Sequence, residues 1–146
     1  MQLDLKSQKD REFLLTDIIP KVDVLLESYR PGTMEKLGLS PEVVHTVNPK
    51  VIYGRLSGYG QVQTKYRERA GHDINYLAIS GILNKFKRFS KDNAPSPPAN
   101  LLADFASGSL HLFTQVLQGL YLKKPRTVID CSLTHSTLYL SQLSLL

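Results

Sequence analysis

Cysteine is nearly absent from this sequence, and Cys131 is its single representative. One thiol supports neither an intrachain disulfide framework nor a cysteine cage for a metal ion. Long apolar runs are missing too, since no stretch approaches the roughly 20 residues that a membrane-spanning helix needs. These absences argue against a disulfide-rich secreted protein and a membrane protein, and they favour a reducing, intracellular compartment.

Recognisable targeting and cofactor motifs are also lacking. The first residues have no apolar core of a signal peptide, and the early acids Asp4, Asp10 and Glu12 are unlike a transit peptide. The last four residues form no clear address signal. The interior has no G-x-G-x-x-G fingerprint, no G-x-S-x-G elbow, no internal repeat and no His/Asp/Glu set at metal-ligand spacing. We therefore expect no bound metal ion.

Basic residues are in excess, and the 146-residue chain has a formal net charge of +5. A basic surface attracts anions such as phosphates, although a solvated lysine-rich loop is the more ordinary explanation. Phe86 and Phe89 alternate with basic residues, but no RNP-like or helix-turn-helix pattern surrounds them, so nucleic acid is not an expected partner. Two clusters hold much of the charge: Lys85, Lys87, Arg88 and Lys91, then Lys123, Lys124 and Arg126.

The length suits one domain, residues 1–146, and helical and strand patterns alternate along it. The proline-rich residues 85–99 are expected to form a surface loop. Short apolar runs predict strands over residues 22–26, 50–56 and 128–130. Helical spacing and end signals predict helices over residues 7–19, 33–37, 40–47, 73–82 and 100–122, and a leucine-rich amphipathic run follows at 136–146.

Several predicted helices have defined end signals. Ser7 and Thr33 are candidate N-caps. Pro41, directly after Ser40, suits the first helical position. Gly38 is typical of the residue that follows a helix, where a left-handed backbone is common.

This order of elements predicts an α/β fold with a parallel sheet. In such folds, ligands collect at the carboxyl ends of the strands. The loops after Leu26 and Leu56 are therefore the first places to look for a site. The longest predicted helix carries small residues at Ala103 and at positions 106–109, which permit close approach of another backbone.

His72 follows Gly71 at the start of an apolar helical run. A neutral imidazole is a competent base near pH 7, and Gly71 allows an unusual backbone angle beside it. Unpaired N–H groups at the helix start point toward the same space, where they would hold a developing oxyanion. The alternative is a histidine that caps the helix or is hydrogen-bonded in a packed interior.

Asp104 lies in an apolar stretch near the start of the longest predicted helix. Apolar surroundings raise the pKa of a carboxyl group and a helix N-terminus lowers it, and the sequence does not decide between them. A poised carboxyl group suits acid–base chemistry, whereas a first-turn aspartate that only stabilises the helix dipole is the alternative. Asp73 either caps its own helix or orients His72.

Several strings, in order along the chain, carry a resemblance to a known family. The most telling are Ala-Gly-His-Asp-Ile-Asn-Tyr at 70–76 and Asn-Leu-Leu-Ala-Asp-Phe-Ala at 100–106. From residue 3 to about 143, the sequence resembles the α-methylacyl-CoA racemases, within the family III CoA-transferase superfamily. The other matching strings lie at residues 3–6, 23–27, 30–32, 34–37, 48–49, 52–53, 55–61 and 129–130.

The resemblance implies a Rossmann-like parallel sheet flanked by helices, incomplete relative to the family, with a long helix after the Asp104 string. Family members run to more than twice this length. The chain would thus be the large-domain portion of a family III domain, without the N-terminal βα segment and the C-terminal half. His72 and Asp104 fall on the family's catalytic acid–base pair. The family's acyl-CoA contacts fall on Leu3, Asp4, Leu5, Gly71, His72, Asp73, Ile74, Asn75 and Tyr76.

The implied reaction is racemisation of 2-methyl-branched acyl-CoA thioesters of the fatty-acid or bile-acid type. One group removes the proton from the carbon next to the thioester carbonyl, and the other returns a proton to the opposite face of the planar enolate. Backbone N–H groups near Gly71 and Asp73 would hold the enolate oxygen, and no cofactor or metal is required. The basic clusters would bind the phosphates of CoA.

Two other functions stay open. In a CoA-transferase, Asp104 would attack the thioester as a nucleophile. A catalytically inactive fragment would instead bind CoA, or pair with a full-length homologue, without turnover. The resemblance also implies a homodimer, a location in the peroxisome or the mitochondrion, and neither nucleic acid nor membrane as a partner.

Overall fold

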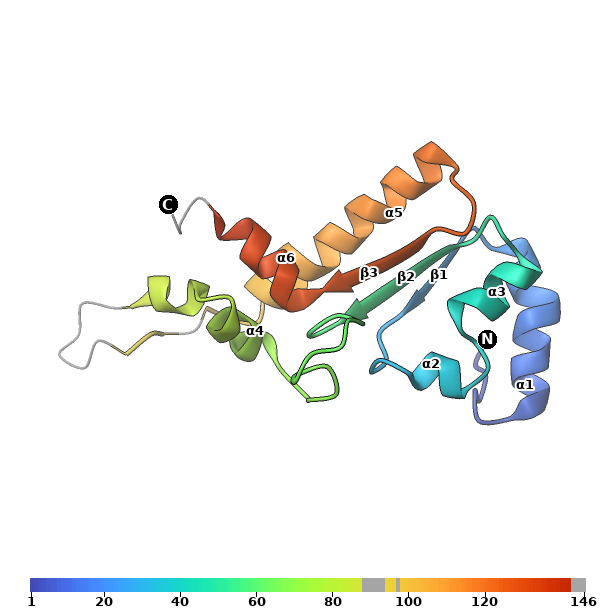
Figure 1. The fold of residues 1–146 in the computed structure, drawn as a ribbon, viewed down its shortest axis with the longest axis horizontal. Helices are drawn as coiled ribbons and strands as arrows, with labels where there is room; N and C mark the ends of the chain where they lie inside the picture. Colours follow the sequence, from blue (N-terminus) through green and yellow to red (C-terminus); the bar gives the residue numbers. More distant parts are fainter. Residues whose placement is uncertain (88–93, 97, 143–146) are drawn as a thin grey trace.

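The computed structural model describes residues 1–87, 94–96 and 98–142, and its centre is one open sheet of three parallel strands (Figure 1). The strands are β1 (Val24–Glu27), β2 (Ile52–Ser57) and β3 (Val128–Ser132), with β2 in the middle. Each predicted strand is present, shifted by one to two residues at its start or end. The prediction of an α/β fold with a parallel sheet is confirmed.

Helical segments connect and flank these strands (Figure 1). The predicted helix at 100–122 is two consecutive helical segments of different pitch, because a π-helix precedes the α-helix. The segments are α1 (Gln8–Phe13), η1 (Leu14–Ile18), η2 (Ile19–Lys21), α2 (Thr33–Lys36), α3 (Pro41–Val47), α4 (Asp73–Ile79), η3 (Ile82–Phe86), η4 (Leu102–Ser109), α5 (Leu110–Leu122) and α6 (Leu133–Leu140). Of these, η1 and η4 are π-helices, and η2 and η3 are 3₁₀-helices.

Most of the predicted helix ends are found. The hydroxyl oxygens of Ser7 and Ser40 each accept a hydrogen bond from the backbone N–H three residues on, at 3.4 Å. Gly38 follows α2 with φ +72°. The N-cap of α2, however, is Gly32 and not Thr33, because φ of +83° at Gly32 makes the turn and Thr33 is already helical.

Two segments differ from the sequence prediction. Within the expected loop at 85–99, η3 extends through Phe86, and Lys87 pairs with Pro95 in an antiparallel bridge; residues 88–93 and 97, with Arg88, Phe89 and Lys91, lie outside the described residues. The amphipathic run expected from 136 begins earlier, with α6. The Ser132 hydroxyl caps α6 by accepting the His135 N–H at 3.3 Å, and 143–146 lie outside the described residues.

The two faces of the sheet are covered by different helices, because successive residues of a strand point to opposite sides. Tyr53 packs with Ile19, Met34 and other residues of η2, α2 and α3. Its neighbour Ile52 faces the other way and packs against Leu112 and Val116 of α5.

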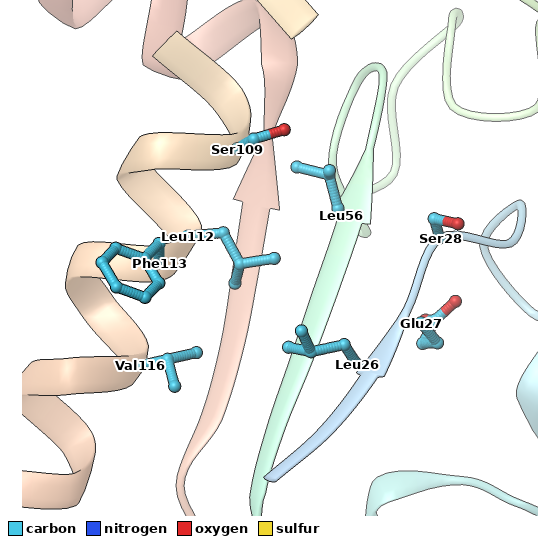
Figure 2. A pocket seen from close by; sticks show the side chains of 8 residues that line it. All are labelled: Leu26, Glu27, Ser28, Leu56, Ser109, Leu112, Phe113 and Val116. Carbon is cyan, nitrogen blue, oxygen red and sulfur yellow. The ribbon is translucent and has the colours of Figure 1, made fainter. Parts of the chain in front are cut away.

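The α5 side of the sheet is only partly covered. Figure 2 shows an apolar groove of 290 Å³ between α5 and the carboxyl-terminal part of β1 and β2. At its wall, Leu26 is 59% exposed and Phe113 58%. The groove lies beside Ser28, at the end of β1, where the candidate site begins.

Candidate functional site

A cavity of 270 Å³ lies at the carboxyl ends of β1 and β2, where the parallel sheet was expected to hold a site. The loop after β1, the turn after β2 and the segment before α4 form its wall. We call it the arginine cavity. Its lining residues are Ser28, Tyr29, Arg30, Pro31, Ser57, Gly58, Tyr59, Arg67, Arg69, Ala70, Gly71, His72 and Tyr76.

Three arginines line this cavity, and no acidic residue is among its described lining residues, so the charged side chains there are all positive. The Nε of Arg67 donates to the carbonyl of Gln61 at 3.0 Å, and the guanidinium of Arg69 lies 6.0 Å from the ring centre of Tyr66. Arginine N–H groups match phosphate oxygens in charge and geometry. None of the three arginines was predicted as a binding residue; the closeness of Arg67 and Arg69 to His72 in the chain was the missed signal.

His72 is the N-cap of α4 and its side chain lines the arginine cavity. Its backbone N–H donates to the Asn75 side-chain oxygen at 2.9 Å, and its carbonyl accepts the Asn75 N–H at 2.8 Å. Asn75 therefore fixes the backbone that carries the imidazole. This also commits the His72 N–H, so any oxyanion donor in this turn must come from a neighbouring residue.

Gly71 is needed for space rather than for backbone angle. It is not among the glycines with positive φ, so the expectation of an unusual angle is wrong. A Cβ at Gly71 would lie 2.7 Å from the Tyr59 hydroxyl and 2.7 Å from the Tyr76 ring, and one at Gly58 would lie 2.6 Å from the same ring. Two glycines thus admit Tyr76, whose ring meets that of Tyr59 edge to face at 5.3 Å.

Asp73 does neither of the two things considered from the sequence. His72, not Asp73, is the N-cap of α4, and no hydrogen bond joins the Asp73 carboxylate to His72 in the described residues. Instead, Oδ2 of Asp73 accepts the N–H of Ala103 at 2.7 Å and that of Asp104 at 3.0 Å. Asp73 therefore connects the segment at 70–76, which contains His72, to the segment at 100–106, which contains Asp104. No local sequence pattern predicts this contact.

Asp104 is half-buried in the first turn of η4, beside this bond. Burial raises the pKa of the Asp104 carboxyl group, the charge of Asp73 raises it further, and His72 opposes them. The pKa of this first-turn carboxyl group is thus raised, in the direction expected for apolar surroundings. Asp104 and His72 are close enough to interact electrostatically, although Asp104 is not among the residues that line the arginine cavity.

The small residues after Asp104 do permit a close approach, as expected. A Cβ at Gly108 would overlap the side chain of Leu133, the first residue of α6. The Ser107 hydroxyl contacts that of Thr137 at 2.9 Å. The hydroxyls of Ser107 and Ser109 also bond carbonyls five residues back, those of Leu102 and Asp104, in keeping with the π-helical pitch.

Other predicted binding residues lie elsewhere. Leu3, Asp4 and Leu5 do not line the arginine cavity; Leu5 packs beside the core under α2. Ile74 and Asn75 are exposed. The contact of these residues with acyl-CoA stays a prediction.

The remaining candidates have ordinary surroundings. Lys123 and Lys124 border a cavity of 480 Å³ near the amino end of β2, away from His72. His45 is buried with its Nε2 3.0 Å from the Val51 carbonyl. In the described part of the chain, no three His, Cys, Asp or Glu residues cluster as metal ligands, and no helix has the length and hydropathy to cross a bilayer.

Comparison with known proteins adds a family and a fold. The model of CoA-transferase family III matches residues 1–146. The chain is 45% identical to human alpha-methylacyl-CoA racemase over 143 residues, which is 95% of this chain and 36% of that protein. It is 42% identical to the CaiB/baiF CoA-transferase family protein ZK892.4 of Caenorhabditis elegans, over 96% of this chain and 42% of that protein.

A solved structure agrees with this family. The crystal structure of the hypothetical protein Rv3272 from Mycobacterium tuberculosis superposes with a TM-score of 0.86 at 29% identity, covering 98% of this chain and 40% of that one. The chain spans about two fifths of the length of the curated relatives it matches.

Proposed function

The chain belongs to CoA-transferase family III, and from that premise we propose that it racemises 2-methyl-branched acyl-CoA thioesters through His72 and Asp104. One observation carries the proposal. The Asp104 N–H bonds to the carboxylate of Asp73, and Asp73 adjoins His72 at the wall of an arginine-lined cavity. A proton acceptor and a carboxyl group are thus held together beside a place for phosphates. The 45% identity to the human racemase supports the same reaction.

The chemistry needs two groups because a single base tends to return the proton to the face that it left. Neutral His72 removes the proton from the carbon next to the thioester carbonyl, and the electron pair moves to the carbonyl oxygen as an enolate. Protonated Asp104, whose pKa is raised by burial and by the charge of Asp73, then donates a proton to the opposite face. The reverse reaction starts from imidazolium and carboxylate, so the pair serves both hands of the substrate.

Phosphate binding by the arginine cavity is the second part of the proposal. Arg30, Arg67 and Arg69 would hold the phosphates of CoA, while Gly71 and Tyr76 shape the wall next to His72. The thioester would then lie toward the imidazole.

A CoA-transferase is the other candidate, favoured by the name of the family. In that reaction the Asp104 carboxylate attacks the thioester carbonyl, the C–S bond breaks, and a mixed anhydride forms while CoA leaves as a thiolate. This step needs ionised Asp104, and it gives His72 no evident task.

Deuterium exchange separates the functions. The protein is incubated in deuterated water with one enantiomer of a 2-methylacyl-CoA, and deuterium at the α-carbon is followed by mass spectrometry together with chiral analysis. We expect exchange in the wild type and a fall of about 10²-fold or more in His72→Ala and in Asp104→Asn. His135→Ala, an exposed histidine outside the arginine cavity, is the control.

Other outcomes point to the other functions. Transfer of CoA to an added carboxylic acid without α-deuteration indicates a transferase. Saturable CoA binding with neither reaction indicates a binding fragment and contradicts the proposal. A homodimer and a location in peroxisomes or mitochondria follow from the family resemblance alone; sedimentation equilibrium and imaging of the tagged protein test them.

A further inference from the structure

Asp73 is the most deeply buried carboxylate near the site, with 1% of its surface exposed. Its Oδ2 accepts two backbone N–H groups, from Ala103 and Asp104. Its Oδ1 is also buried and has no hydrogen-bond partner, and no ion pair to Asp73 is found in the described residues. A carboxylate left in this state is costly to bury, so its presence calls for an explanation beyond packing.

The position of Asp73 in the fold supplies that explanation. It is the first residue of α4, and the N–H groups that it accepts belong to the first turn of η4, where no intrahelical partner is available. Two helix starts, separated by about 30 residues of chain, therefore meet at one carboxylate. His72 is attached to one of them and Asp104 to the other.

We propose that Asp73 is a positioning residue, whose buried carboxylate bonds the backbone of Ala103 and Asp104 and so holds Asp104 in place relative to His72. The same contact places the Asp73 carboxylate beside the Asp104 carboxyl group, so its negative charge opposes ionisation of Asp104. The proposal rests on the proposed function in so far as Asp104 is the proton carrier. The Asp73 carboxylate acts in this scheme through the backbone that carries Asp104, because it bonds the N–H groups of Ala103 and Asp104.

The surroundings of Asp104 are consistent with this role. Of the charged groups on α4, Asp73 raises and His72 lowers the pKa of Asp104. Tyr76 is uncharged near neutral pH, since burial raises its pKa to about 12. On α5 and α6, which also pack against η4, His111, His135 and Tyr139 line a separate cavity, and Tyr121 is exposed near the carboxyl end of α5.

The test compares two substitutions that remove different parts of the interaction. Asp73→Asn retains an oxygen for the two N–H groups and removes the charge, whereas Asp73→Ala removes both. Asp10→Asn is the matched control, because Asp10 lies on α1 and its carboxylate also accepts a backbone N–H, that of Asp4. Carbon-13 NMR of the carboxyl groups follows the titration of Asp104, assigned with Asp104→Asn, and hydrogen exchange follows the amides of Ala103 and Asp104.

We expect the titration midpoint of Asp104 to fall in Asp73→Asn while the two amides stay protected. In Asp73→Ala, exchange at both amides should accelerate at least tenfold, and Asp10→Asn should change neither. In the α-deuteration assay, Asp73→Asn should lower kcat with little change in KM and shift the pH profile.

Unchanged titration of Asp104 in Asp73→Asn would overturn the proposal, and this result can be read even if Asp73→Ala does not fold. The NMR result does not depend on turnover. A wild type without α-deuteration would therefore refute the proposed function and still leave the role of Asp73 decided by the titration.

Discussion

Two buried acids, Glu27 at the end of β1 and Asp73 at the start of α4, are stabilised in opposite ways. Glu27 is 6% exposed, and its Oε1 lies 2.6 Å from Nε of Arg55. Its other oxygen accepts the Tyr29 N–H at 2.8 Å, so both oxygens have partners. Asp73 is more deeply buried, and it has two backbone donors on one oxygen and no partner on the other.

The effect on neighbouring groups differs accordingly. Glu35 also binds Arg55, at 2.7 Å, and the hydrogen bond from Arg55 lowers the pKa of Glu35 against the opposing effect of burial. Asp104, next to the unpaired charge of Asp73, has its pKa raised by burial and by that charge. One arginine thus pairs with an acid from β1 and an acid from α2, whereas a buried carboxylate without a cation among the described residues raises the pKa of a candidate catalytic group.

The largest expected effect comes from removing the arginine that Glu27 and Glu35 share, with Arg55→Met. This leaves Glu27 buried without a cation, so we expect the free energy of unfolding to fall by about 3–5 kcal/mol. Urea denaturation followed by circular dichroism measures it. Arg67→Met is the control, because Arg67 meets the exposed Glu68 only at 3.7 Å; its cost should stay below about 1 kcal/mol. An equal fall in the free energy of unfolding of both variants would show that the buried ion pairs of Arg55 stabilise the protein no more than the surface pair of Arg67.

A smaller effect is expected on the Asp73 side, from Gly71→Ala. The added Cβ would lie 2.7 Å from both the Tyr59 hydroxyl and the Tyr76 ring. To avoid this overlap, the segment that carries His72 must move, and we expect the free energy of unfolding to fall by about 1–3 kcal/mol. Thermal unfolding measures the cost, and Ala70→Ser, at an exposed neighbour, should be nearly neutral. A fully stable Gly71→Ala would contradict the close packing of Tyr76.

A third substitution addresses the arginine cavity itself. Arg69→Ala should weaken CoA binding by roughly 1 kcal/mol, or about fivefold, through loss of one charged contact to phosphate. Isothermal titration calorimetry at two salt concentrations checks this, since the loss should shrink at high salt. Lys65→Ala is the control, because it removes a nearby positive charge that does not line the cavity. An equal loss of CoA affinity in Lys65→Ala would show that Arg69 acts through general electrostatic attraction and not through a direct contact with phosphate.

The smallest effects concern the pH dependence of stability, and they contrast Glu35, which shares Arg55 with Glu27, with Asp104, which lies beside Asp73. Glu35 has a pKa lowered from 4.5, so its contribution to stability is present above that pH and is lost as the pH falls through the folded-state value. Glu35→Gln should therefore be destabilising at pH 7, by less than about 1 kcal/mol for this partly exposed pair, and nearly neutral in acid.

The contribution of Asp104 to stability should change with pH in the opposite direction. Its pKa is raised from 3.8, so the folded state binds the proton more tightly and stability is lost as the pH rises through the window above 3.8. Asp104→Asn should therefore raise the melting temperature at pH 7, with the gain vanishing below about pH 3.8. Calorimetry over this range checks both variants, and parallel pH dependences for Glu35→Gln and Asp104→Asn would contradict the comparison.

The sequence predicted the local elements well because their signals are local. Short apolar runs located the three strands, and Ser7, Ser40 and Gly38 marked helix ends through contacts within a few residues. Thr33 failed as a cap because Gly32 made the turn one residue earlier. The start of α6 was missed since its cap, Ser132, is also the last residue of β3.

The candidate site was predicted only in part. His72 and Asp104 were identifiable from their strings, and the carboxyl ends of β1 and β2 were the expected place. Arg67 and Arg69 were missed, because surface arginines are common and only the fold turns these two toward one cavity. The angle expected at Gly71 was wrong, since the need for glycine comes from the rings of Tyr59 and Tyr76.

By itself, the amino-acid sequence determined most of the segments that form strands and helices, and its strings carried the family resemblance that singles out His72 and Asp104. Those properties depend on residue types and on spacings of a few positions. Only the tertiary structure decided that Asp73 bonds the backbone of Asp104, because that contact spans about 30 residues and depends on how α4 and η4 pack. Burial and neighbouring charge, which set proton affinity, likewise exist only once the chain has folded.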